Sequence, residues 1–145
     1  MILWRATRRP FADLSGEGGR LFSGRWHSEG RPVVYTAENA ALAMLELRVN
    51  LDLPPELLPP DYVMMRIIVP EDVSIQHSSV SPADTESAKL AGDEWLRSEA
   101  SLLLRVSSAV APESFNYLVN PHHLEVEQLI IDSVNAFDFD KRLFG

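Results

Sequence analysis

The distribution of glycine constrains the fold of this chain more than any other feature of its sequence. Residues 15–32 read SGEGGRLFSGRWHSEGRP and hold five of its seven glycines. This concentration predicts a long irregular loop rather than a helix or strand. Loops of this length inside a compact domain commonly carry function. The glycines fit neither the P-loop nor the strand–GxGxxG–helix pattern, which argues against nucleotide sites of the P-loop and Rossmann types.

Two segments have the composition and periodicity of helices. The first, residues 38–48, is rich in Ala and Leu, and we expect Thr36 as its N-cap and Glu38 in its first turn. The second, residues 88–98, predicts a short helix with Trp95 facing inward.

Short strand-like runs make up most of the remaining chain. Prolines between residues 54 and 60 and the polar segment 78–86 indicate connecting loops. The β-branched residues within 128–137 favour a strand over a helix there. Strands are also expected over 3–6, 33–36, 62–69, 73–76, 101–110 and 115–119. The sequence therefore predicts one mixed α+β domain spanning residues 1–145.

Composition excludes several classes of protein. The chain has 145 residues, 46% of them hydrophobic, and no cysteine. It can therefore bury a core without disulfides, and it has neither a thiolate nucleophile nor Cys-ligated zinc. The lack of cysteine agrees with a reducing compartment, and we expect a cytoplasmic protein. No run approaches the roughly 18 apolar residues of a membrane helix, and the N-terminus does not read as a signal peptide.

Charge is distributed unevenly along the chain. The formal net charge of -8 argues against direct contact with nucleic acid. Residues 1–50 nevertheless hold seven arginines and no lysine against five acidic residues, so the acidic excess lies in the second part. Surface salt bridges are the ordinary explanation for any one of these arginines. As a cluster they indicate a local site for an anionic small molecule, because guanidinium groups pair bidentately with phosphate or carboxylate.

Glu46 is the most informative single residue. At 100° per residue, Leu42, Leu45 and Val49 share one face of the predicted helix, and Glu46 lies beside Leu42 on that face. A carboxylate on a core-facing stripe is costly unless it is paired or hydrogen-bonded. Two interpretations stay open: a glutamate at the edge of the stripe, paired or solvated, and a carboxylate at the floor of a cleft that acts on a substrate.

Arg25 and Tyr35 frame the passage from the glycine-rich loop to the predicted helix. Each alone has an ordinary explanation, which is a loop salt bridge for Arg25 and a core position for Tyr35. Together with Glu46 they would supply a phosphate clamp, a stacking surface and a catalytic carboxylate.

Other polar residues give weaker signals. No G-x-S-x-G pattern surrounds Ser107 or Ser108, which disfavours a hydrolase nucleophile. His122 and His123 lack the i,i+4 spacing of a helical metal pair and fit a turn better than a metal site. Asn116, beside a short apolar run, is typical of a turn.

Five segments of the chain resemble the RES domain family, named for an arginine, a glutamate and a serine. They are residues 24–48, 92–96, 105–110, 116–123 and 137–143, in order and over nearly the whole length. The resemblance implies a fold similar to that of ADP-ribosyltransferases, with split, mostly antiparallel sheets flanked by short helices. It also implies a toxin of a bacterial toxin–antitoxin pair that consumes NAD+ by hydrolysis, phosphorolysis or ADP-ribosyl transfer.

Carried over by position, the resemblance assigns Arg25, Tyr35 and Glu46 to catalysis. Glu46 would hydrogen-bond a ribose hydroxyl and stabilise positive charge on the sugar, as a carboxylate does in glycoside hydrolysis. Tyr35 would pack against the nicotinamide or its ribose, and Arg25 would hold the diphosphate. The expected substrate-binding residues are Arg25, Tyr35, Ser108, His27 and Asn116.

Ser108 corresponds to the serine of the family, and we expect it to orient the nicotinamide or to support Glu46. The family commonly has asparagine at the position of His27 and proline at that of Ser107. The first departure could alter contacts near Arg25, and the second could loosen the backbone that presents Ser108.

The resemblance also implies ligands and partners. NAD+ would be the substrate, and neither a cofactor nor a metal is expected. The expected partner is a cognate antitoxin with a DNA-binding domain, whose C-terminal segment blocks the active site. A homodimer within such a complex is a further expectation. The sequence does not decide the acceptor of the ADP-ribosyl group, the oligomeric state or the strength of toxicity.

Three other functions compete with NAD+ cleavage by hydrolysis or phosphorolysis. The first is ADP-ribosylation of a protein target. The second is a non-catalytic protein whose cleft binds an antitoxin, with the acidic second part of the chain facing a basic partner. The third, an RNA-cleaving toxin that uses His122 or His123, fits poorly with the net charge of -8.

Overall fold

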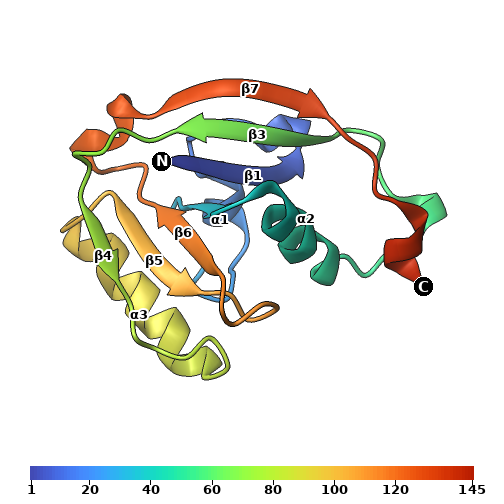
Figure 1. Cartoon of the computed structure of the whole chain (residues 1–145). Helices are drawn as coiled ribbons and strands as arrows, with labels where there is room; N and C mark the ends of the chain where they lie inside the picture. Colours follow the sequence, from blue (N-terminus) through green and yellow to red (C-terminus); the bar gives the residue numbers. More distant parts are fainter.

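Seven strands form one sheet in the computed structural model, which describes residues 1–145 (Figure 1). Their order across the sheet is β4-β5-β6-β2-β1-β3-β7. All neighbouring strands are antiparallel except β4 and β5. The strands are β1 (Ile2–Arg8), β2 (Val34–Ala37), β3 (Tyr62–Ile68), β4 (Ile75–His77), β5 (Leu103–Ser107), β6 (Phe115–Val119) and β7 (Ile130–Ala136).

The sheet is nearly split at its centre. β1 pairs with β2 only where Trp4 meets Ala37, whereas β1 pairs with β3 along its whole length. The half made of β4, β5, β6 and β2 therefore diverges from the half made of β1, β3 and β7 (Figure 1). This arrangement confirms the split, mostly antiparallel α+β fold that the resemblance implies.

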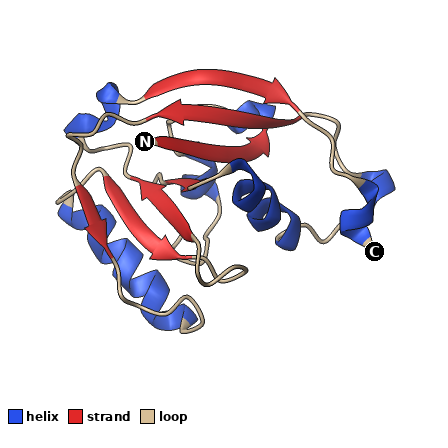
Figure 2. Cartoon of the chain, viewed as in Figure 1, coloured by secondary structure: helices blue, strands red, loops and turns tan.

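Three α-helices flank the sheet, and Figure 2 draws them in blue together with the short 3-10 helices. α1 (Glu17–Leu21) is a short helix inside the glycine-rich segment, which is otherwise irregular as predicted. α2 (Ala40–Val49) follows β2 and lies beside the split. α3 (Thr85–Ser98) packs along β4 and β5. None of the helices has the length and apolar character that a membrane span requires.

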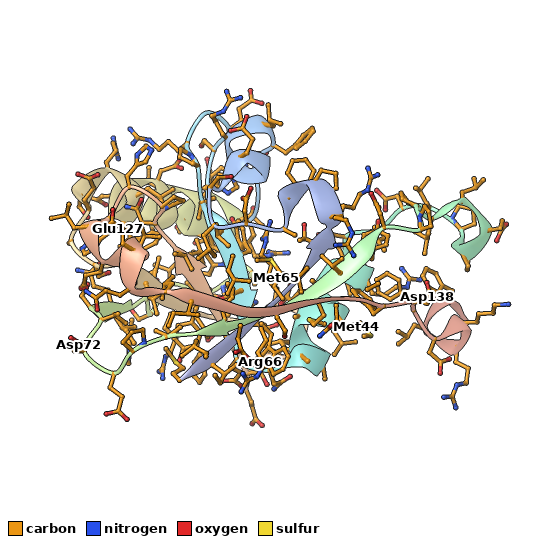
Figure 3. The ribbon with its side chains drawn as sticks, turned by 90° about the horizontal axis from the view of Figure 1, so that it is seen from above. Met44, Met65, Arg66, Asp72, Glu127 and Asp138 are labelled. Carbon is orange, nitrogen blue, oxygen red and sulfur yellow. The ribbon has the colours of Figure 1, made fainter.

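Clusters of buried apolar side chains pack against both halves of the sheet. One cluster includes Leu3, Met65 and Val119, all fully buried, and Met65 lies near the middle of the sheet when it is seen from above (Figure 3). A second cluster packs under α3 and contains Trp95, whose Nε1 donates a hydrogen bond of 2.8 Å to the Oγ of Ser101. The inward orientation predicted for Trp95 is therefore confirmed.

Acidic side chains lie at the ends of the sheet. In the same view the exposed residues Asp72 and Glu127 lie in the left part of the molecule and Asp138 lies in the right part (Figure 3). The acidic excess of the second part of the chain thus includes exposed groups in both parts of the molecule.

The start of α2 differs from the prediction. Its N-cap is Asn39, whose Oδ1 accepts a hydrogen bond of 2.8 Å from the backbone N–H of Leu42. Thr36 belongs to β2, where it is buried and donates its hydroxyl to the carbonyl of Tyr117. Glu38 precedes the helix and is exposed. The nearer cap prevails because Asn39 can satisfy a free N–H of the first turn while Thr36 stays in the strand.

Other element bounds also shift. α3 begins at Thr85, within the predicted loop 78–86, because Asp84 caps it by accepting from the N–H of Ser87 at 3.1 Å. β5 is shorter than the extended run 101–110 predicted for it. β7 confirms the strand preferred over a helix for residues 128–137.

Candidate active site

A cleft of about 920 Å³ opens at the split between the two half-sheets. Side chains from β1, the glycine-rich loop, β2, α2, β6 and the first turns of α3 line it. Five of the residues singled out in the sequence reach this cleft, although they are spread over more than ninety positions of the chain. They are Arg25, His27, Tyr35, Glu46 and Asn116.

Glu46 is half-buried in the cleft wall formed by α2. Its Oε1 accepts two hydrogen bonds, from the Oγ of Ser108 at 2.6 Å and from the Nδ2 of Asn116 at 2.7 Å. Hydrogen bonds to an ionised carboxylate are short and strong, so this pair fixes the orientation of the side chain. Oε2 accepts no hydrogen bond from the protein and is reachable by solvent, so it is free to act in the cleft.

The apolar stripe predicted around Glu46 is only partly present. Leu42 is buried, but Leu45 and Val49 are 39% and 53% exposed. Ala43 is the second buried residue of α2, because the helix turns its Leu42–Ala43 edge toward the sheet at the split. Glu46 lies one turn after that edge, beside the cleft, and forms no ion pair with an arginine.

Ser108 lies behind Glu46 rather than in the cleft. It is fully buried, and its Oγ accepts hydrogen bonds from the N–H groups of Val110 at 3.2 Å and Ala111 at 3.0 Å. Its single proton is donated to Glu46. All hydrogen-bonding positions of the hydroxyl are thereby taken, so Ser108 supports the carboxylate and has none left for a molecule in the cleft.

Tyr35 and His27 form the opposite wall. The Oη of Tyr35 lies 2.8 Å from Nδ1 of His27 and accepts the backbone N–H of Trp26 at 3.1 Å. His27 is 1% exposed, and its Nε2 lies 2.8 Å from the carbonyl oxygen of Gly19. Burial raises the pKa of Tyr35, so the phenol keeps its proton at neutral pH.

Arg25 is an exposed side chain at the rim of this wall. Its Nη1 donates a hydrogen bond of 2.5 Å to the carbonyl oxygen of Pro82, in the loop before α3. It forms no salt bridge, so its charge is not neutralised by a carboxylate of the chain. Lys89, from α3, is half-buried in the same part of the cleft.

Arg5 is a site residue that sequence reasoning missed. It lines the cleft from β1, and its Nη1 donates a hydrogen bond of 3.1 Å to the backbone carbonyl of Tyr35. Its Nε is buried without a partner. Burial lowers the pKa of Arg5 to about 10, which leaves it cationic at neutral pH. The available signal in the sequence was an arginine at the centre of a predicted strand. Burying a charged side chain there costs free energy unless the charge has a partner or a function.

The two histidines considered for metal or RNA chemistry lie outside the cleft. His122 is exposed in the turn after β6, and His123 accepts the N–H of Glu125 at 3.0 Å through its Nδ1. His123 therefore caps a short 3-10 turn, as a turn histidine would. The structure contains no group of three or more His, Cys, Asp or Glu side chains arranged to hold a metal ion.

Known proteins with similar sequences are toxins by name. The chain is 43% identical to "Toxin Res" of Pseudomonas putida, over 99% of this chain and 100% of the relative. It is 33% identical to the "Prs ADP-ribosylating toxin" of a Sphingobium species, over 90% of this chain and 86% of the relative. The first of these matches covers nearly the whole chain and therefore both half-sheets.

A solved structure shares the fold. The chain is similar to a protein in the crystal structure of the M. tuberculosis MbcT-MbcA toxin-antitoxin complex, with a TM-score of 0.76. The similarity covers 99% of this chain and 86% of that one, at 20% sequence identity. The sequence itself matches the model of the RES domain over residues 2–140. The chain therefore belongs to the RES domain family.

Proposed function

We propose that this protein is the toxin of a toxin–antitoxin pair and that it depletes NAD+ by cleaving the nicotinamide–ribose bond. The observation that carries the proposal is the carboxylate of Glu46, which is fixed through one oxygen by Ser108 and Asn116 and has its other oxygen free at the cleft. The toxin names of the relatives agree with it.

The reaction needs a negative charge beside the ribose. As the C1′–N bond breaks, its electron pair leaves with the nicotinamide nitrogen, and the sugar develops oxocarbenium character. Oε2 of Glu46 would accept a ribose hydroxyl and stabilise that charge. An oxygen of the acceptor then bonds to C1′ and releases its proton to solvent. A carboxylate that is already oriented does not have to reorganise during this step, which favours catalysis.

Cations in the cleft suit the diphosphate of NAD+. Arg5 and Arg25 both line the cleft near Tyr35, and neither forms a salt bridge. The guanidinium of Arg5 lines the cleft, where its charge would attract the diphosphate. In this proposal Tyr35 packs its ring against the nicotinamide or its ribose. Ser108 supports Glu46, and Asn116 and His27 shape the site around the substrate.

ADP-ribosyl transfer to a protein is the second candidate function. One relative is named an ADP-ribosylating toxin, and water, phosphate and a protein side chain can all attack the same oxocarbenium-like carbon. NAD+ is a substrate in every one of these reactions. The proposal includes no cofactor and no metal.

A cognate antitoxin is the proposed protein partner. The solved structure with the same fold is that of a toxin–antitoxin complex. We propose that the antitoxin carries a DNA-binding domain, blocks the cleft with its C-terminal segment, and joins two toxin chains in one complex. The acidic excess of residues 51–145 suits a basic surface on that partner.

One incubation separates the candidates. Pure protein is mixed with NAD+, with and without inorganic phosphate and with and without a cell lysate, and the ribosyl product is identified by mass spectrometry. ADP-ribose indicates hydrolysis, ADP-ribose 1″-phosphate indicates phosphorolysis, and a modified protein indicates transfer. If NAD+ is not consumed in any arm, or if Glu46→Ala consumes it at the wild-type rate, the proposed mechanism is wrong.

A further inference from the structure

The imidazole of His27 joins the glycine-rich loop to β2. Its Nε2 lies 2.8 Å from the carbonyl oxygen of Gly19 and 3.0 Å from that of Phe22, and its Nδ1 lies 2.8 Å from the Oη of Tyr35. A carbonyl oxygen only accepts hydrogen bonds, so Nε2 carries a proton, and we assign the ring this proton alone. Nδ1 is then an acceptor, and Tyr35 donates its hydroxyl proton to it.

This arrangement commits the hydroxyl of Tyr35 to the protein. The oxygen gives its proton to His27 and accepts the N–H of Trp26 at 3.1 Å. The loop backbone closes tightly over it, since a Cβ on Gly24 would lie 2.6 Å from Oη. Tyr35 therefore faces the cleft with a ring of fixed orientation and has no proton to offer a substrate.

We infer that His27 is a positioning residue that locks the substrate-binding wall of the cleft. It ties the loop that bears Arg25 to the strand that bears Tyr35. The inference rests on the proposed function, in which this wall binds NAD+. Glu46 is held by a separate set of hydrogen bonds, from Ser108 and Asn116, none of which involves His27. Loss of His27 should therefore weaken binding of NAD+ and leave the chemical step nearly intact.

Substitutions can separate the two ends of the imidazole. In His27→Asn, the Oδ1 occupies the position of Nδ1 and can still accept the hydroxyl of Tyr35, but nothing reaches the loop carbonyls. In His27→Gln, the Nε2 amide can reach the carbonyls of Gly19 and Phe22, but the acceptor for Tyr35 is lost. His27→Phe removes both ends at similar volume. His122→Asn, at an exposed ring, is the matched control.

The hydrogen bonds from His27 to the carbonyls of Gly19 and Phe22 form a tether of the loop, and the rate of trypsin cleavage tests this tether without an assay of activity. Arg20 and Arg25 provide cleavage sites within the tethered loop, and mass spectrometry identifies the cuts. We expect the rate of these cuts to rise about tenfold in His27→Asn and His27→Phe, because each has lost a buried hydrogen bond to the loop. The wild type, His27→Gln and His122→Asn should be cut at similar rates. Equal rates in all five proteins would overturn the tether.

Steady-state kinetics test the positioning role. We expect His27→Phe to raise KM for NAD+ about tenfold, the loss that one or two buried hydrogen bonds produce, with kcat within about threefold of the wild type. A fall in kcat at unchanged KM would overturn the inference, because that pattern indicates loss of folded enzyme or damage to the chemical step. If His27→Phe does not fold, His27→Asn and His27→Gln supply the same comparison. A wild type that consumes no NAD+ refutes the proposed function, while the trypsin result still decides the tether.

Discussion

Removing the hydroxyl of Ser108 tests the support of Glu46. Ser108→Ala deletes the donor 2.6 Å from Oε1 and leaves the N–H groups of Val110 and Ala111 without their acceptor. A hydrogen bond to a charged group contributes about 1.5–3 kcal/mol, which corresponds to a decrease in kcat/KM of about 10- to 160-fold. Loss of these two part-buried hydrogen bonds should lower the free energy of unfolding by about 1–3 kcal/mol.

The assay pairs initial rates of NAD+ loss with thermal unfolding. Ser107→Ala is the control, because Ser107 neighbours Ser108 at the end of β5 and its side chain makes no hydrogen bond. We expect the control to match the wild type in both measurements. A Ser108→Ala enzyme with wild-type kcat/KM would show that Glu46 does not depend on Ser108, and the account of the site would be wrong at that point.

Four further predictions concern the other donor to Glu46, a cleft cation, a buried glycine and a carboxylate outside the cleft. Asn116→Asp places a second carboxylate about where the Nδ2 of Asn116 lies, 2.7 Å from Oε1 of Glu46. Repulsion between like charges favours a shared proton on the two carboxyl groups, so the rate of NAD+ consumption at pH 7 should fall about 100-fold. Asn116→Ala, which adds no charge, should consume NAD+ faster than Asn116→Asp and more slowly than the wild type. Arg5→Met removes a cleft cation and should raise KM for NAD+ about tenfold in initial-rate assays. Gly92→Ala should lower the melting temperature strongly, because its Cβ would lie 1.6 Å from the carbonyl oxygen of Trp26, whereas Gly18→Ala meets only the Phe11 ring at 3.5 Å and should not. Hydrogen bonds from Ser74 hold the pKa of Glu125 below its ordinary 4.5. The stabilisation that they provide is therefore present above pH 4.5 and is lost as the pH falls below it. In Glu125→Gln, the free energy of unfolding measured with urea should fall less between about pH 6 and pH 3 than in the wild type.

The sequence predicted where the elements lie better than where they begin. Short β-branched runs located the strands, and the glycine-rich segment located the loop that forms one wall of the cleft. Helix starts were missed where a closer cap existed, as at Asn39 and Asp84. Capping depends on which side chain reaches a free N–H, and propensity alone does not decide this.

The sequence predicted which residues belong to the site, but it did not predict all the hydrogen bonds between them. The resemblance brought together Arg25, Tyr35 and Glu46, which the fold then placed in one cleft. The second donor to Glu46 was not foreseen, because Asn116 lies seventy positions away on a strand two places from β1. Arg5 was missed for a similar reason: its neighbour Tyr35 is reached only by pairing of strands remote in sequence.

The most direct test of the central claim is the rate of NAD+ loss with Glu46→Gln. The glutamine keeps an Oε1 that can accept from Ser108 and Asn116, so its side chain can stay in place while the charge at the cleft is lost. We predict a fall in kcat of about 1,000-fold with an unchanged melting temperature, the loss expected when electrostatic stabilisation of the transition state is removed. A Glu46→Gln enzyme that consumes NAD+ at a rate within about tenfold of the wild type would contradict the account.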